Sequence, residues 1–121
     1  MRQKTRVATL NQKQIEFTRC VGHFVVWCFR NNYDVIGAEL YRTKEQAELY
    51  AASGRGIINS AHRLKLAIDL FRVVKGVVSW DLERYEPLGE QWKKMHPDAR
   101  WGGDFKNRDC VHFSFEHQGR Q

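Results

Sequence analysis

The chain has 121 residues, 42% of them hydrophobic and 28% charged, which is enough for one hydrophobic core and too little for two ordinary domains. No segment is low in complexity or rich in Pro and Ser, so the composition excludes a disordered chain or a linker. The formal charge of +6 comes from Lys and Arg scattered along the chain, which is typical of a solvated surface. Attraction to a polyanion, whether nucleic acid, anionic membrane or anionic cell wall, is the alternative.

Export and membrane insertion are not indicated by the sequence. Its three cysteines lack the paired spacing of a disulfide framework or a zinc knuckle, which favours folding in a reducing cytoplasm. Residues 1–14 include basic side chains but no apolar run of the secretory type, and the longest apolar stretch, at residues 24–29, is too short to span a bilayer. We therefore expect a chain that is made in the cytoplasm and does not insert stably into membranes.

The first half of the chain predicts two helices and a strand. Residues 11–30 have apolar side chains at helical spacing, with Asn11 as the N-cap. Residues 34–42 have the composition of a strand. Residues 43–53 predict a second helix that begins with a capping box at Thr43.

The second half predicts two more strands and one more helix. Residues 66–72 and 110–117 are strand-like, and a turn is expected at residues 75–76. Residues 81–96 predict a helix that stops before Pro97. Helices and strands do not alternate regularly, so we expect a single α+β domain spanning residues 1–121, with a mostly antiparallel sheet flanked by helices.

An aspartate interrupts the predicted strand at residues 66–72. Alternation along a strand places Asp69 on the face of Ala67 and Phe71, opposite the face of Ile68 and Leu70. A carboxylate that is at least half buried must be paired, protonated or bound to a metal, because an isolated charge is costly to remove from water. A salt bridge or an exposed strand face is the simpler interpretation.

A histidine holds the corresponding position in the last predicted strand. His112 shares a face with Cys110 and Ser114, while Val111 and Phe113 face the other side. A histidine in such a position is often a hydrogen-bonded structural residue, and that alternative stays open for His112 taken alone.

Four residues together supply the groups of a catalytic zinc site: His62, Asp69, Asp109 and His112. Two imidazoles and one carboxylate suit a zinc ion whose fourth position is open to water, and the other carboxylate can then act as a base. His62 and Asp69 are an odd number of positions apart, as are Asp109 and His112, so on a continuous strand the members of each pair would lie on opposite faces. We therefore expect His62 to precede a bend and Asp109 to precede the last strand.

Three short motifs resemble those of a zinc peptidase family that includes bacterial D-alanyl-D-alanine carboxypeptidases and dipeptidases and bacteriophage L-alanyl-D-glutamate endolysins. The resemblance extends over roughly residues 38–116. The matching residues are Ser60, His62, Ala67, Asp69, Trp101, Gly102, Gly103, Asp104, Phe105, Asp109, His112 and Phe113.

This resemblance implies a zinc D,D-peptidase (Hedgehog-like) fold and a role for each polar residue of the motifs. Zinc would be bound by His62, Asp69 and His112, and Asp109 would act as general acid and base. Arg42, in a segment similar to the arginine segment of the family, would clamp a substrate carboxylate or stabilise the oxyanion, although it is equally a surface arginine at a helix start.

Two further residues of the motifs are predicted to contact substrate, and two positions depart from the family pattern. Ser60 and Trp101 are the predicted substrate contacts, although Trp101 with its two glycines would also make a packed turn. The departures are Lys65, where the family commonly has Gly, and Val111, where it commonly has Pro. Neither departure removes a chemical group.

The resemblance implies a phage endolysin that hydrolyses the L-alanyl-D-glutamate bond of peptidoglycan stem peptides. The short stretch between Asp69 and Trp101 favours an open groove, and Arg42, Arg63 and Lys65 would suit anionic groups of the wall. We expect a monomer that does not bind nucleic acid and reaches the cell wall or periplasm after holin-dependent release. The alternatives are a D-alanyl-D-alanine carboxypeptidase or dipeptidase, and a non-enzymatic zinc-stabilised binding module.

Overall fold

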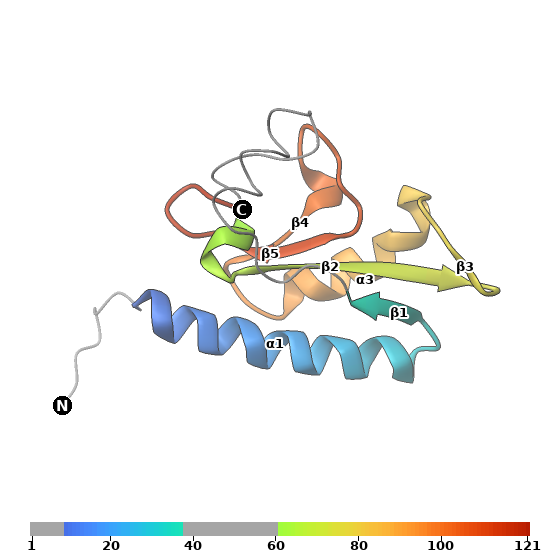
Figure 1. The fold of residues 1–121 in the computed structure, drawn as a ribbon, viewed down its shortest axis with the longest axis horizontal. Helices are drawn as coiled ribbons and strands as arrows, with labels where there is room; N and C mark the ends of the chain where they lie inside the picture. The colour runs from blue at the N-terminus through green and yellow to red at the C-terminus, as the bar shows by residue number, and fades with distance from the viewer. Residues whose placement is uncertain (1–8, 38–60) are drawn as a thin grey trace.

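A computed structural model describes residues 9–37 and 61–121, with the backbone alone at His62 and Arg63. The elements in chain order are α1 (Leu10–Arg30), β1 (Asp34–Gly37), the 3-10 turn η1 (Ala61–Leu64), β2 (Ala67–Val74), β3 (Val77–Val78), α3 (Leu82–Lys94), β4 (Ala99–Trp101), the 3-10 turn η2 (Gly102–Asp104) and β5 (His112–Phe115) (Figure 1). The helix predicted at residues 43–53 and the end of the strand predicted at residues 34–42 lie outside the described residues.

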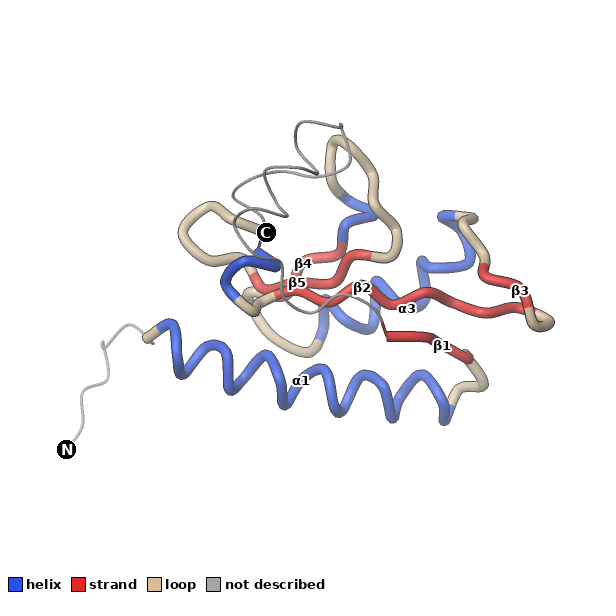
Figure 2. The backbone as a smooth tube through the Cα atoms, in the orientation of Figure 1, coloured by secondary structure: helices blue, strands red, loops and turns tan. Residues whose placement is uncertain are grey.

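The strands form one sheet in the order β1-β2-β5-β4, with the short β3 paired to the far end of β2 (Figure 2). Every strand pairing in the sheet is antiparallel. β2 is the longest strand and pairs with β1, β3 and β5, so it connects the two halves of the sheet. The predicted α+β fold with an antiparallel sheet and helices is confirmed.

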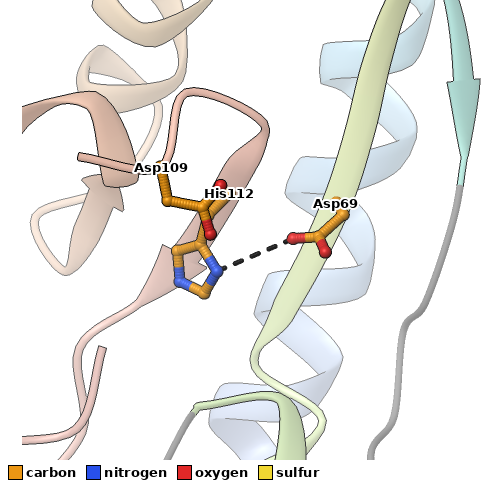
Figure 3. Close-up of side chains that lie close together, drawn as sticks. All are labelled: Asp69, Asp109 and His112. Carbon is orange, nitrogen blue, oxygen red and sulfur yellow. Dashed lines mark ion pairs between the residues drawn. The ribbon is translucent and has the colours of Figure 1, made fainter. Parts of the chain in front are cut away.

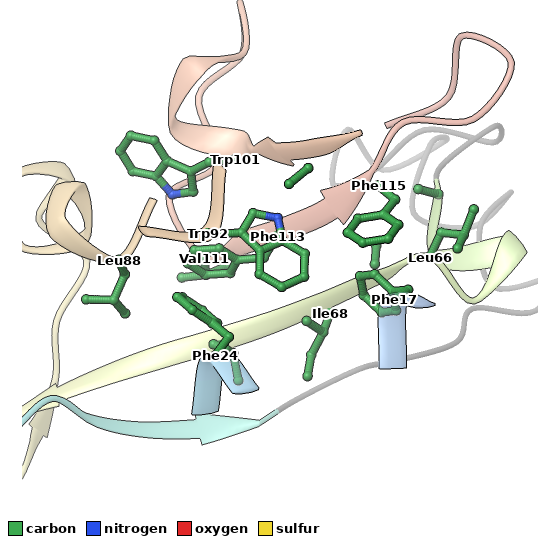
Figure 4. Packing of buried hydrophobic residues seen from close by; sticks show 14 of the residues in the cluster. Phe17, Phe24, Leu66, Ile68, Leu88, Trp92, Trp101, Val111, Phe113 and Phe115 are labelled. Carbon is green, nitrogen blue, oxygen red and sulfur yellow. The ribbon is translucent and has the colours of Figure 1, made fainter. Parts of the chain in front are cut away.

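One face of the sheet packs against both described helices. Phe24 of α1 lies 5.3 Å, between ring centroids, from Trp92 of α3 and 5.2 Å from Phe113 of β5 (Figure 4). Phe115 of β5 contacts Trp92 and also Phe17 of α1, with ring centroids 5.7 and 5.2 Å apart. This aromatic cluster is fully or almost fully buried, and it fixes the sheet face that carries Ile68 and Phe113 as the core face.

Helix α1 begins earlier than the sequence predicted. Its N-cap is Thr9, whose Oγ1 accepts a hydrogen bond from the Gln12 backbone N–H at 3.1 Å. The Gln12 side-chain oxygen accepts in return from the Thr9 N–H at 3.0 Å. The prediction of Asn11 as the cap was wrong because this reciprocal pair satisfies two helix-terminal donors at once.

The hairpin between β2 and β3 contains the expected turn. Lys75 and Gly76 have φ values of 53° and 79°, and two consecutive left-handed residues make the tight turn that matches the twist of paired strands. Downstream, α3 ends at Lys94, two residues before the predicted end, and Met95 caps it. Both β3 and β4 were missed, since two or three residues are too few to show alternation.

No helix among the described residues is both long enough and apolar enough to cross a membrane.

Candidate metal centre

Asp69 and His112 lie directly opposite each other on neighbouring strands. The antiparallel register of β2 and β5 pairs Asp69 with His112 and Ile68 with Phe113. Because paired residues share a face, the two polar side chains project together from the sheet (Figure 3). Their neighbours Ile68 and Phe113 occupy the core face, so this is the side away from the aromatic cluster. His112 is 5% exposed, and its Nδ1 lies 3.7 Å from Oδ1 of the partly buried Asp69. The structure thus places both residues as the strand alternation predicted.

Asp109 approaches this pair from the loop that joins η2 to β5. Its backbone N–H donates to the carbonyl oxygen of Gly102 at 2.9 Å, and its own carbonyl accepts from the His112 N–H at 3.1 Å. Within the described part of the chain, Asp69, Asp109 and His112 form a set whose ligand atoms all lie within 4.8 Å of one another. Asp109 therefore precedes the last strand, as its spacing required, and its exposed carboxylate faces the same point as the other two groups.

Gly102 allows this close approach. A Cβ atom at position 102 would lie 2.2 Å from the carbonyl oxygen of Asp109 and 2.8 Å from Cβ of His112. The Gly102 carbonyl also accepts hydrogen bonds from two backbone N–H groups, those of Phe105 and Asp109. The sequence showed Gly102 only as part of a motif, and the two consecutive glycines were the signal of a close backbone contact.

Trp101 anchors the same loop to the rest of the fold. Its indole N–H donates to the carbonyl oxygen of Cys110 at 2.9 Å, and the side chain is 3% exposed. Cβ atoms at Gly89 of α3 and at Gly103 would each lie within 2.4 Å of the indole, so both glycines are needed to seat it. The described contacts of Trp101 are this hydrogen bond and packing within the fold, and a direct contact with substrate stays a prediction.

An ion-pair cluster ties the loop to α3 from outside. Lys93 lies 2.8 Å from Asp104 of η2 and 3.0 Å from Glu90. Hydrogen bonds to these two carboxylates raise the pKa of the Lys93 ammonium, chiefly the bond to Asp104. The loop that carries Asp109 is therefore held at both its buried and its solvent-facing side.

The second ring nitrogen of His112 has a defined partner. Nε2 lies 3.0 Å from the backbone carbonyl oxygen of Gln121. A carbonyl only accepts, so in this hydrogen bond Nε2 is the donor, and Nδ1 is the ring nitrogen that faces Asp69. Metal-binding histidines are commonly oriented in this way by a carbonyl or carboxylate behind the ring. One imidazole and two carboxylates, so arranged, fit a divalent metal ion such as zinc.

His62 lies in the 3-10 turn η1, which contacts both β2 and β5. Lys65, which follows the turn, has a φ of 57°, and the Leu66 N–H donates to the Ala61 carbonyl at 3.1 Å. This hydrogen bond closes a six-residue turn that contains one left-handed residue. The arrangement resembles a Schellman motif, and it reverses the chain before β2 begins. The bend expected after His62 is therefore present. Placement of the His62 imidazole lies outside the described atoms, and Arg42 and Ser60 lie outside the described residues.

Cys110 lies beside the site, but its sulfur contacts a backbone carbonyl outside it. Sγ lies 3.8 Å from the carbonyl oxygen of Trp80. Burial, and after it the charge of Asp109, raise the pKa of the thiol. A protonated thiol is a poor metal ligand, so the described environment favours a structural role for Cys110.

The fold is similar to that of the L-Ala D-Glu endopeptidase ChiX from Serratia marcescens. The superposition has a TM-score of 0.70 and covers 84% of this chain and 78% of that chain, at 20% sequence identity. At this identity the likeness establishes a shared fold. No protein-family model matches the sequence, and the comparison with curated proteins gives no match.

Proposed function

We propose that this chain is a zinc-dependent peptidase that hydrolyses the L-alanyl-D-glutamate bond of peptidoglycan stem peptides. The observation that carries the proposal is the convergence of Asp69, Asp109 and His112 on one point of the sheet face that the core leaves free. The shared fold with an L-Ala D-Glu endopeptidase supports the choice of substrate.

The proposed chemistry divides the polar residues between binding and proton transfer. His62, Asp69 and His112 would hold the zinc ion, which supplies a Lewis acid and lowers the pKa of water toward about 7. Asp109 is exposed and lies beside two of the proposed ligands, Asp69 and His112, so it can take the proton from the attacking water. It would then deliver that proton to the leaving amine as the peptide bond breaks.

Other residues would bind the substrate. Arg42 is proposed to clamp a carboxylate of the stem peptide or to stabilise the oxyanion, and Ser60 and Trp101 to shape the binding surface. A phage endolysin acting at the cell wall, released with the help of a holin, is the biological setting we propose. The fold likeness favours this endopeptidase over a D-alanyl-D-alanine carboxypeptidase or a non-enzymatic module.

Digestion of purified sacculi tests the proposal. The intact protein, loaded with zinc, should create new N-terminal D-glutamate residues, identified by mass spectrometry after labelling of free amines. His112→Ala should create none. Release of D-alanine without new D-glutamate termini would show that the protein is a carboxypeptidase and not an endopeptidase. If the zinc-loaded protein hydrolyses nothing, the non-enzymatic binding module becomes the favoured interpretation.

A further inference from the structure

An aromatic pair, in which Phe71 is partly buried and Trp80 is exposed, lies on the same side of the sheet as the candidate metal centre. Phe71 is two residues beyond Asp69 on β2 and therefore shares its face. The ring of Trp80, which follows the hairpin, stands edge-on to that of Phe71, with centroids 5.4 Å apart and an interplanar angle of 61°. The Trp80 side chain is nevertheless 67% exposed.

The neighbouring strand extends the same apolar surface. β1 pairs Ile36 with Phe71, so the two side chains share a face, and Ile36 is 51% exposed. Ile36, Phe71 and Trp80 are called here the aromatic platform. It continues the sheet face that carries Asp69, on the side away from α1 and α3.

The platform lies at a defined distance from the proposed chemistry. Residues two apart on a strand are separated by about 7 Å, which together with the edge-on ring contact places the Trp80 indole on the order of 10 Å from Asp69. The hydrogen bond from the Cys110 thiol to the Trp80 carbonyl connects this segment to the residue that follows Asp109. The platform is thus held against the loop that carries the proposed base.

The size of the platform limits what it can bind. A stable protein interface uses about 20–30 residues on each side, far more than these three side chains. A sugar ring matches better, because one face of a pyranose presents C–H groups that pack on an indole while its hydroxyl groups stay in water. In peptidoglycan such a ring is close to the proposed bond: L-alanine is joined to muramic acid through a lactyl group.

The expected distance from the scissile bond to the muramic acid ring agrees with the distance from the candidate metal centre to the platform. One residue spans at most about 3.6 Å and the lactyl group adds a similar length, so the muramic acid ring begins roughly 7 Å from the L-alanyl-D-glutamate bond and extends beyond it. We propose that the aromatic platform, with Trp80 as its main contact, binds the muramic acid ring of the substrate. This inference rests on the proposed function and adds a glycan subsite to it.

Two matched substrates test the subsite. One is the disaccharide-peptide released from peptidoglycan, and the other is the same stem peptide without its sugars. The ratio of kcat/KM for the sugar-bearing substrate to that for the bare peptide should exceed one for the wild-type protein and fall about tenfold in Trp80→Ala. Trp80→Phe should restore much of the ratio. Phe29→Ala removes another exposed aromatic, from α1, and should leave the ratio unchanged.

The outcomes separate the subsite from the proposed function. An unchanged ratio in Trp80→Ala, or an equal loss on both substrates, would overturn the subsite while leaving the peptidase in place. Ile36→Ala provides a second variant and should lower the ratio in the same direction. If the wild-type protein cleaves neither substrate, its tryptophan fluorescence is titrated with the N-acetylglucosaminyl-muramic acid disaccharide. Because the chain has four tryptophans, saturable quenching that is lost in Trp80→Phe supports the platform. Absence of quenching in the wild type, or equal quenching in Trp80→Phe, overturns it.

Discussion

Asp69 and Asp109 carry the same functional group in different surroundings. Asp69 is partly buried on a central strand and faces Nδ1 of His112 at 3.7 Å. Asp109 is exposed at the end of a loop. A rigid, shielded carboxylate suits metal binding, whereas a base needs access to water and to the leaving group. These surroundings support Asp69 as a ligand and Asp109 as the base.

Asp109→Asn should separate the two roles. The amide keeps the shape of the side chain but does not accept a proton, so we expect zinc content to stay near that of the wild type and kcat to fall about a hundred- to ten-thousand-fold. Metal analysis and turnover on the disaccharide-peptide measure both effects. Asp69→Asn is the matched control and should lose zinc instead. Near-normal turnover in Asp109→Asn would assign the base to another residue.

Lys65 adopts a backbone conformation that suits glycine better. Its φ of 57° lies in the left-handed region, which strains a residue with a Cβ atom by about 1 kcal/mol. Lys65→Gly should therefore raise the free energy of unfolding, by about 0.5 kcal/mol once the extra freedom of glycine in the unfolded chain is subtracted. Urea denaturation measures the change. Lys65→Ala keeps the strain and should bring no gain, and an equal gain in both variants would place the effect in the lysine side chain.

At the scale of elements, the loop from η2 to β5 is the part that completes the site. It is anchored by the Trp101 indole, by the Lys93 ion pairs and by the double hydrogen bond to the Gly102 carbonyl. The two strands beneath it fix Asp69 and His112, but only the loop brings Asp109 to them. Catalysis should therefore be more sensitive to changes in the loop than overall folding is.

Gly102→Ala tests this sensitivity. The added methyl group would meet the Asp109 carbonyl and Cβ of His112, so the loop has to move and we expect kcat to fall by at least a hundredfold. Gly22→Ala is the control, because its methyl group meets nothing within 4 Å in α1. That variant should gain about 0.5–1 kcal/mol of stability and retain its turnover. Normal turnover in Gly102→Ala would show that the loop is free to adjust.

The sequence predicted the longer elements, whose pattern is local, and failed at the Thr9 cap, at the two shortest strands and where the partners are distant. Alternation alone placed Asp69 and His112 on the correct faces, because the period of a strand is independent of its neighbours. The acceptor behind His112 and the contact of Gly89 with Trp101 depend on how distant segments meet, which no local pattern records. The role of Lys65 in the bend after His62 became visible only from its dihedral angle.

At the scale of the whole molecule, the candidate site and the core are two faces of the same strands. Ile68 and Phe113 point into the aromatic cluster, and their neighbours Asp69 and His112 point to the candidate metal centre. Any change that disturbs the pairing of β2 with β5 therefore also separates Asp69 from His112. Metal binding and folding should be thermodynamically linked.

Metal removal should accordingly lower stability. A metal ion that binds only the folded chain adds about 2.7 kcal/mol when its concentration is a hundred times its dissociation constant. We expect the thermal midpoint of the wild-type protein to fall on chelation and to return when zinc is added. His112→Ala, compared with and without chelator, should show no difference. A midpoint that is independent of metal in the wild type would exclude a tight site.

The pairing of Asp69 with His112 also has a consequence for the rates of folding and unfolding. The two residues belong to strands that are far apart in the sequence, and a register shift of one residue would turn one of them into the core. The two proposed ligands thus meet only after β2 and β5 have paired in the correct register, late in the folding reaction. In a chevron plot, a bound metal ion should therefore leave the refolding rate constant almost unchanged and lower the unfolding rate constant, because it binds only after the sheet has formed.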